Sequence, residues 1–196
     1  MLANLGKFQE AWDSLEAFQQ HVFQVLTGAK PPEVEDYDVD DLNSERGIDY
    51  TRLRDLLRAR DWRAADQETY RLMITTVGKE EGQWFDDKDL EEFPREELHT
   101  LDQLWVKYSH GHFGFSVQKE VWKEYDSPTT LGDEWDEFCV KLGWQDSTES
   151  RYMSEDELIY DPKKSPIAEL PATFLLCGIG SLIHRRYRSL LSRRDL

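Results

Sequence analysis

The sequence has few cysteines and no long apolar run. Its 2 cysteines, Cys139 and Cys177, lie far apart without metal-ligand spacing, so we interpret them as free thiols in a reducing compartment. The longest apolar stretch, 172–183, is interrupted by glycines and is too short to span a bilayer. The first residues show neither a charged leader with an apolar run nor an Arg/Ser-rich transit pattern. These absences favour a soluble protein.

Positive charge is scarce over most of the chain. The formal net charge is -16, which excludes general binding to nucleic acid because phosphates would be repelled over most of the surface. Residues 171–196 are the exception: five arginines and one aspartate give +4, so the preceding residues hold -20. An acidic body with a basic tail favours basic partner surfaces or cations.

Motifs of catalysis are also missing. We find no phosphate-binding loop, Walker motif, nucleophile elbow or cluster of zinc ligands. The abundant carboxylates stand in runs typical of solvated helix ends, and Cys139 lies between core positions of its helix. Nothing supplies a nucleophile with its base, so we predict that the chain is not an enzyme.

What the sequence does hold is amphipathic helices. Apolar residues recur every three or four positions over residues 5–25, and six acids follow within 33–41. We expect an N-terminal amphipathic helix over 1–28, an acidic linker over 29–48, a helical domain over 49–171 and a basic amphipathic tail over 172–196. The tail has two interpretations: a packed terminal helix, or a helix lying on anionic lipid.

The predicted domain is all-α. Helices are expected from about 50 to 57, from 62 to 77 and from 131 to 142, with Gly143 as a stop. Thr100 with Gln103 fits a capping box at the start of another helix, and Ser116 is expected to cap the next. No segment alternates between apolar and polar residues as a strand would.

One loop, residues 109–116, is unusual in carrying two glycines, two phenylalanines and two histidines. The glycines let the backbone bend tightly. Phe113 and Phe115 would then either plug the core or line an apolar slot. His110 and His112 would be either surface imidazoles or metal ligands.

Several groups of residues form a recognisable set when taken in order: Trp62, Ala65-Asp66-Gln67-Glu68-Thr69, Phe93-Pro94, Thr100 to Trp105, Ser109-x-Gly111-x-Phe113-Gly114-Phe115-Ser116-Val117-Gln118, Trp122, Trp135, Phe138 and Gly143-Trp144. Together they resemble the genomes-uncoupled-four family of magnesium-chelatase regulators.

The resemblance implies a small helical fold with an open groove for protoporphyrin IX or Mg-protoporphyrin IX. It also implies a non-catalytic role, in which the protein stimulates magnesium chelatase in chlorophyll biosynthesis. The protein would act in the cytoplasm of a cyanobacterium or in the plastid stroma. We also consider peripheral contact with a membrane through the basic tail.

Carried over by position, Phe93 is the leading wall residue of this groove. Trp84, Leu90, Phe113 and Phe115 are the other expected wall residues. By helical spacing, Trp105 and Trp122 are assigned to the fold instead. The prediction requires the rings of Phe93 and Phe113 to stand open to solvent beside a cleft.

The sequence also departs from the family pattern. His112 replaces an arginine, and Ala168-Glu169-Leu170-Pro171 stands where the family has Gly-His-Leu-Pro, after Ile167 in place of a basic residue. Cations that could replace the lost ones are Arg151, Lys163 and Lys164. The alternative is therefore a divergent paralogue that serves as an interaction module, or that binds a bilin or a haem with His110 or His112 as axial ligand.

Overall fold

The computed structural model describes residues 40–149, 151–172 and 181–196, with the side chains of 181–183 left aside. The helix expected over 1–28 and most of the acidic linker lie outside the described residues. Residues from Asp41 onward form one compact unit.

The described residues form α-helices and one short 3-10 helix. These are α2 (Thr51–Arg58), α3 (Trp62–Thr76), α4 (Asp87–Glu91), α5 (Arg95–Tyr108), α6 (Phe115–Glu124), α7 (Asp133–Lys141), η1 (Glu155–Glu157) and α8 (Ser181–Leu191). Within this part of the chain there is no strand, only an isolated bridge between Gln145 and Tyr152. The all-α prediction is confirmed.

Local sequence explains where several helices begin. The Asp61 side chain accepts a hydrogen bond from the backbone N–H of Ala64 and caps α3. Asp86 and Asp89 form a reciprocal capping box at the start of α4. After α7, Gly143 adopts a φ of 76°, the left-handed conformation expected of the predicted stop.

Two predicted caps are wrong. Thr100 lies inside α5, which begins at Arg95 after Pro94, and its hydroxyl donates to the carbonyl of Asn43 at 2.8 Å. Ser116 lies in the first turn of α6, whose N-cap is Gly114. The N-cap of α5 is Pro94, and the N-cap of α6 is Gly114, which has a φ of 139°.

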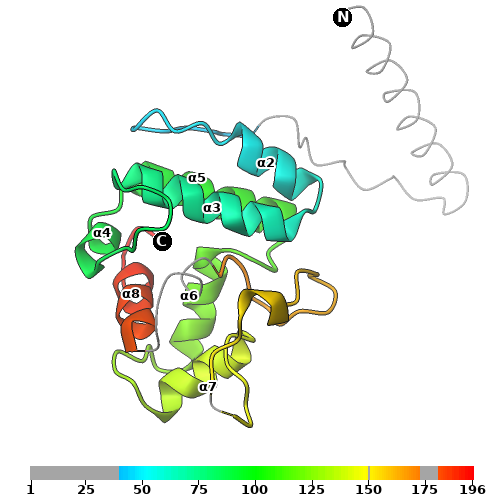
Figure 1. Cartoon of the computed structure of the whole chain (residues 1–196), viewed down its shortest axis with the longest axis vertical. Coiled ribbons are helices and arrows are strands. Elements are labelled where there is room, and N and C mark those ends of the chain that lie inside the picture. The colour runs from blue at the N-terminus through cyan, green and yellow to red at the C-terminus, as the bar shows by residue number, and fades with distance from the viewer. Residues whose placement is uncertain (1–39, 150, 173–180) are drawn as a thin grey trace, which may run out of the picture. The chain divides into compact units, whose positions relative to one another are not determined.

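The helices pack in two groups (Figure 1). In the first group, α2 packs against α3 and α5. In the second, α6, α7 and α8 lie together, and α8 contacts both α6 and α4. Contacts between α5 and α6 join the groups.

Aromatic rings fill the centre of each group. Around α3 and α5, the Phe113 ring lies edge-on to Trp62 and Trp105, with centroid distances of 5.5 and 6.1 Å. In the other group Trp144 lies 5.9 Å from Phe138 and 4.5 Å from Tyr187 of α8. Each such pair adds about 0.5–1.5 kcal/mol beyond its buried area. Trp105 and Trp122 are buried, as their spacing predicted.

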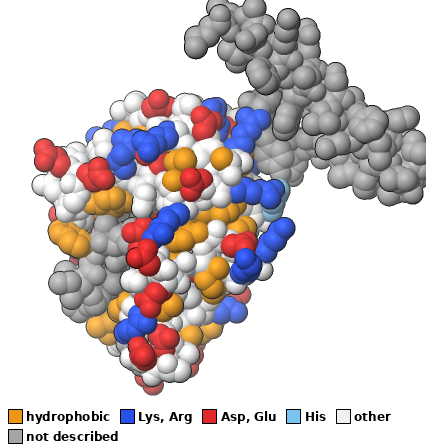
Figure 2. Space-filling model, turned by 45° about the vertical axis from the view of Figure 1, so that its right-hand side comes forward, with side chains coloured by type: hydrophobic (Ala, Val, Ile, Leu, Met, Phe, Trp, Pro, Cys, Tyr) orange, Lys and Arg blue, Asp and Glu red, His pale blue; other side chains and the backbone are white. Residues whose placement is uncertain are grey.

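Both ends of the described unit are fixed to it. The end of the expected linker, residues 43–48, is held on α5, where Ser44 and the backbone N–H of Arg46 donate to Glu97. In the tail, Tyr187, Leu190 and Leu191 are buried, which matches the packed terminal helix rather than a helix on lipid. On the face shown in Figure 2, side chains of both charges are interspersed. Among the described helices, none is long and apolar enough to cross a membrane.

Candidate functional site

The predicted wall residues fall into two classes. Leu90, Phe93, Phe113 and Phe115 are all buried, with 2 % exposure or less, whereas the Trp84 side chain is 50 % exposed. The expectation that Phe93 and Phe113 stand open to solvent is wrong. Phe113 is enclosed by the rings of Trp62 and Trp105, and Phe93 turns into the interior between α4 and α5. Trp84 is thus the predicted ring that is available to a ligand.

The predicted cations lie in an exposed segment and already have acidic partners nearby. Arg151 forms ion pairs with Glu149 and Glu157, and Lys164 pairs with Asp161. Lys163 is exposed, and its backbone N–H donates to the same Asp161 carboxylate. Exposed pairs of this kind are weak and exchange readily, so these residues are not preorganised for a propionate.

The two histidines of the 109–116 loop have different surroundings. The Nε2 atom of His112 lies 3.2 Å from the carbonyl oxygen of Ser165 and 3.3 Å from its hydroxyl. His110 is exposed and adopts a φ of 55°. No group of three or more His, Cys, Asp or Glu side chains that could hold a metal occurs within the described ranges.

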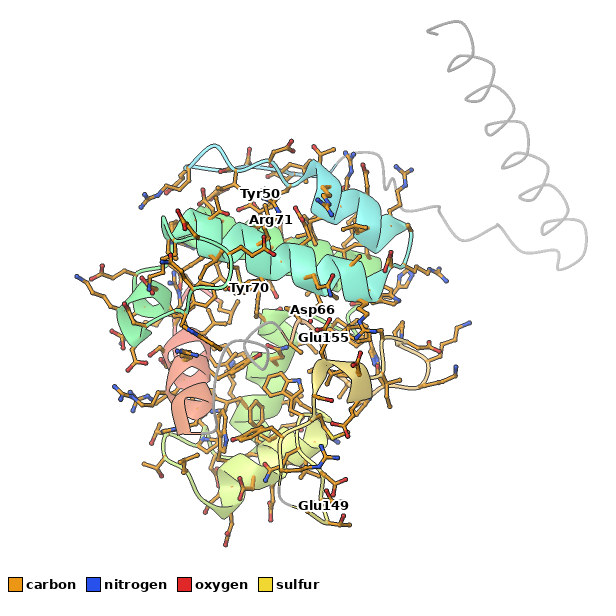
Figure 3. All side chains as sticks on the ribbon, in the orientation of Figure 1. Tyr50, Asp66, Tyr70, Arg71, Glu149 and Glu155 are labelled. Atoms are coloured by element: carbon orange, nitrogen blue, oxygen red, sulfur yellow. The ribbon has the colours of Figure 1, made fainter. Side chains whose placement is uncertain are left out.

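The exposed Trp84 belongs to the α3–α4 loop, residues 77–86, and side chains on both sides fix this loop. The hydroxyl of Tyr70 donates to the carbonyl of Gln83 and accepts from the N–H of Gly82. The ammonium of Lys79 donates to the carbonyl of Trp84 at 2.9 Å and forms ion pairs with Asp86 and Asp89. Figure 3 shows Tyr70 on α3 directed toward this loop. The backbone that carries Trp84 is therefore held at several points.

An arginine of the C-terminal tail lies against the Trp84 ring of this loop. The guanidinium carbon of Arg186, on α8, lies 5.7 Å from the centre of the Trp84 ring, and Arg186 is only 6 % exposed. Its neighbour Arg185 pairs with Asp87 at the start of α4. Sequence reasoning assigned the arginines of the tail to a polar face and missed this contact, because nothing local links residue 186 to residue 84.

A cleft borders the other side of the same loop. It has a volume of about 670 Å³, within the range of small-molecule sites. Its lining combines apolar and charged side chains: Arg46, Ile48, Thr75, Thr76, Val77, Gly78, Lys88, Asp89, Glu92 and Pro94. Val77 and Gly78, at the start of the α3–α4 loop, thus line the cleft, whereas Trp84 is not part of its lining.

Together these features define an all-helical domain with one anchored loop that displays an aromatic plate beside cations. Flat apolar ligands with anionic groups fit such a surface, because the ring contacts their face and the cations contact their edge.

Comparison with known proteins identifies the family. The GUN4-like family model matches residues 43–185, and the chain belongs to this family, as the sequence motifs predicted. The structure resembles that of GUN4 from Chlamydomonas reinhardtii, with a TM-score of 0.65 and 28% identity over 81% of this chain and 97% of that one. It also resembles the ligand-free structure of Arabidopsis thaliana GUN4, with a TM-score of 0.60 and 25% identity over 78% and 97% of the two chains.

Relatives known from sequence come from cyanobacteria and plastids. A Ycf53-like protein of Synechocystis is 35% identical over 53% of this chain and 43% of its own length. The chloroplastic tetrapyrrole-binding protein of Arabidopsis thaliana is 30% identical over 60% of this chain and 46% of its own length. The chain therefore spans less than half the length of these curated relatives.

Proposed function

We propose that this chain binds a tetrapyrrole at the α3–α4 loop, with Trp84 against the face of the macrocycle. The observation that supports this most directly is the half-exposed Trp84 ring held over the buried side chain of Arg186. A relative in the family is named for tetrapyrrole binding, which supports the same ligand class.

The chemistry of the ligand suits this surface. A porphyrin has a wide apolar face and two propionates at one edge, so it needs a flat wall and nearby cations. Trp84 supplies the wall, and the nearby cations are the nearly buried Arg186 of α8 and Lys88 of α4, which also pairs with Glu92. Protoporphyrin IX and Mg-protoporphyrin IX are the proposed ligands; a bilin or a haem is the alternative for a divergent paralogue.

A titration with deuteroporphyrin IX, followed by the visible absorption of the pigment, tests the site. The chain should saturate at micromolar ligand, and Trp84→Ala should weaken binding at least tenfold, or about 1.4 kcal/mol. Leu131→Ala is the matched control, because Leu131 is also 50 % exposed and lies in the loop before α7. Equal affinities for the two variants, or a titration that does not saturate, would contradict the proposal. The same titration with the Mg complex of the porphyrin and with a bilin ranks the affinities of the chain for these ligands.

We further propose that the pigment-loaded protein stimulates magnesium chelatase without doing chemistry itself. Membership of the family supports this role, and relatives from a cyanobacterium and a chloroplast fit action in a cyanobacterial cytoplasm or a plastid stroma. Adding the protein to purified chelatase subunits should raise the rate of magnesium insertion, and Trp84→Ala should lower that stimulation. If the chain bound porphyrin but did not stimulate the chelatase, the binding proposal would stand and the stimulation proposal would be contradicted.

A second candidate is an interaction module that kept the fold and lost the pigment. It is favoured by the burial of four of the predicted wall residues and by Glu169, an acid where the family pattern has a histidine. In that case chelatase subunits would bind the chain with unchanged affinity in the presence and absence of deuteroporphyrin IX, and the pigment titration would show no saturation.

A further inference from the structure

Two carboxyl groups are buried at segment 168–172: Glu169 belongs to the segment, and Asp66 of α3 accepts a hydrogen bond from it. Asp66 lies on α3 and is 0% exposed, and Glu169 lies in the segment 168–172 and is 1% exposed. Burying a carboxylate is costly unless it is paired with a cation or fully hydrogen-bonded. The partners of these two groups therefore decide in which protonation state the fold is stable.

Each carboxyl group is only half satisfied. The Oδ1 atom of Asp66 accepts a hydrogen bond from the backbone N–H of Ala172 at 2.8 Å, and the Oε1 atom of Glu169 accepts one from the N–H of Ile159 at 2.8 Å. The second oxygen of each group, Oδ2 and Oε2, is buried without a hydrogen-bond partner in the described part of the chain. An unpartnered buried oxygen favours the protonated form, which carries no net charge.

The backbone of segment 168–172 is held from several elements. The side-chain amide of Gln118, on α6, donates to the carbonyls of Ala168 and Pro171. The indole N–H of Trp144 donates to the carbonyl of Glu169 at 2.8 Å. On the side of α3, the Asp66 carboxyl is the group that receives the N–H of Ala172. Asp66 therefore connects the segment to the first helix group.

The charged groups nearby do not neutralise the pair. Arg63, one turn before Asp66 on α3, is engaged by Glu155 and Asp156 of η1 and lies 5.4 Å from the centre of the Tyr160 ring. Figure 3 shows Asp66 and Glu155 coming from these two elements.

Two other titratable side chains, Tyr160 and His112, lie close to the pair. Tyr160 has a buried hydroxyl without a hydrogen-bond partner among the described residues, and the His112 ring turns to Ser165. Burial, with the charges of Glu155 and Glu169, raises the pKa of Asp66 to about 7. Burial also raises the pKa of Glu169 to about 7.

We propose that Asp66 and Glu169 act as a proton-linked latch that holds segment 168–172, through Asp66 against α3 and through Glu169 against the backbone of Ile159. While the carboxyl groups are protonated, they bury no net charge and the segment stays closed. When both lose their protons, two like charges with unpartnered oxygens lie in the interior, and the segment loosens. This device regulates the fold itself and does not rest on the proposed pigment binding.

The latch makes stability depend on pH with a definite sign. In the folded chain the pKa values of Asp66 and Glu169 are raised from 3.8 and 4.5 to about 7. Between these limits the folded state binds more protons than the unfolded state, so the free energy of unfolding falls as pH rises. The stabilisation is fully present below about pH 4 and is lost by the time pH has passed about 7.

Thermal unfolding of the full chain between pH 5.5 and 8.5 tests the latch, with these limits chosen about 1.5 units around the two pKa values. The double variant Asp66→Asn with Glu169→Gln keeps the oxygens that accept from Ala172 and Ile159 but cannot ionise. The midpoint of the parent chain should fall by about 10 °C more than that of the double variant over this range. Glu137→Gln, at an exposed position of α7, is the matched control and should keep the parental slope. Parallel slopes for the parent and the double variant would overturn the proposal.

Hydrogen exchange measured by mass spectrometry gives a local test on the parent chain, so its result does not depend on how well a variant folds. After correction for the intrinsic effect of pH, exchange in peptides covering 168–172 of the parent chain should accelerate about a hundredfold from pH 6 to pH 8, because each of the two carboxyl groups shifts the opening equilibrium about tenfold over that range. Peptides from α5 should show no such acceleration. Equal corrected rates at both pH values in segment 168–172 would reject the latch.

Discussion

The loop 109–114 and the α3–α4 loop both carry aromatic residues between helices and each buries a phenylalanine, Phe113 or Phe85, but the α3–α4 loop also leaves the ring of Trp84 half exposed. In the first loop, the Ser109 hydroxyl bonds with the backbone of Phe113, and the N–H of Gly114 donates to the carbonyl of Leu170. Another segment of the chain therefore covers Phe113. In the second loop, Tyr70 and Lys79 bond to backbone carbonyls, Lys79 also pairs with Asp86, and the ring of Trp84 stays outside.

The two loops also use glycine differently: in the first loop a glycine allows close packing onto a helix, and in the second a glycine only allows a turn. At Gly114, which has a φ of 139°, a Cβ atom would lie 2.7 Å from Cγ2 of Val106. That approach requires glycine and brings the Phe113 loop tightly onto α5. By contrast, Gly82 has open space around the position of its missing side chain and serves only the turn.

The largest expected effect comes from truncating the covered ring. Phe113→Ala should lower the free energy of unfolding by about 3–5 kcal/mol, because it leaves a cavity between Trp62 and Trp105. Urea unfolding followed by tryptophan fluorescence measures this loss. The exposed control Leu131→Ala should change stability by less than about 0.5 kcal/mol. If Phe113→Ala lost less than about 1 kcal/mol and still folded, the ring would not be a core element.

A smaller effect is expected where the other loop is held. Tyr70→Phe removes the hydroxyl shared by Gly82 and Gln83 and should cost about 1 kcal/mol or less, because the freed groups are near water. The change should appear as faster hydrogen exchange in peptides covering 79–86 and as weaker binding of deuteroporphyrin IX. Tyr125→Phe, at the end of α6, is the matched control. Unchanged exchange in the α3–α4 loop would show that Tyr70 does not anchor it.

The fold was largely predictable from sequence because its helices are long and strongly periodic. The helix predicted over 62–77 is observed as Trp62–Thr76, and the one predicted over 131–142 as Asp133–Lys141. The start of α5 was placed wrongly at Thr100, because its hydroxyl bonds from inside the helix to Asn43, far away in the chain, and does not cap the helix. Long-range partners of this kind leave no local signal.

The candidate site was predictable only in part. Apolar type and spacing suggest that Leu90, Phe93 and Trp84 lie near one another, but they do not tell which side chain another element covers. Arg186 and Asp66 gain their roles from contacts with distant segments, Trp84 in one case and Ala172 in the other. The resemblance therefore included Trp84 among the expected wall residues but ranked Phe93, which is buried, above it.

The contact between Trp84 and Arg186 joins the early part of the helical unit to its last helix. During synthesis α8 is the last of these helices to leave the ribosome. The Trp84 ring therefore lacks its contact with Arg186 until translation of the unit is almost finished. A nascent chain can therefore build α3 and its loop early, but it can complete this surface only once α8 has emerged.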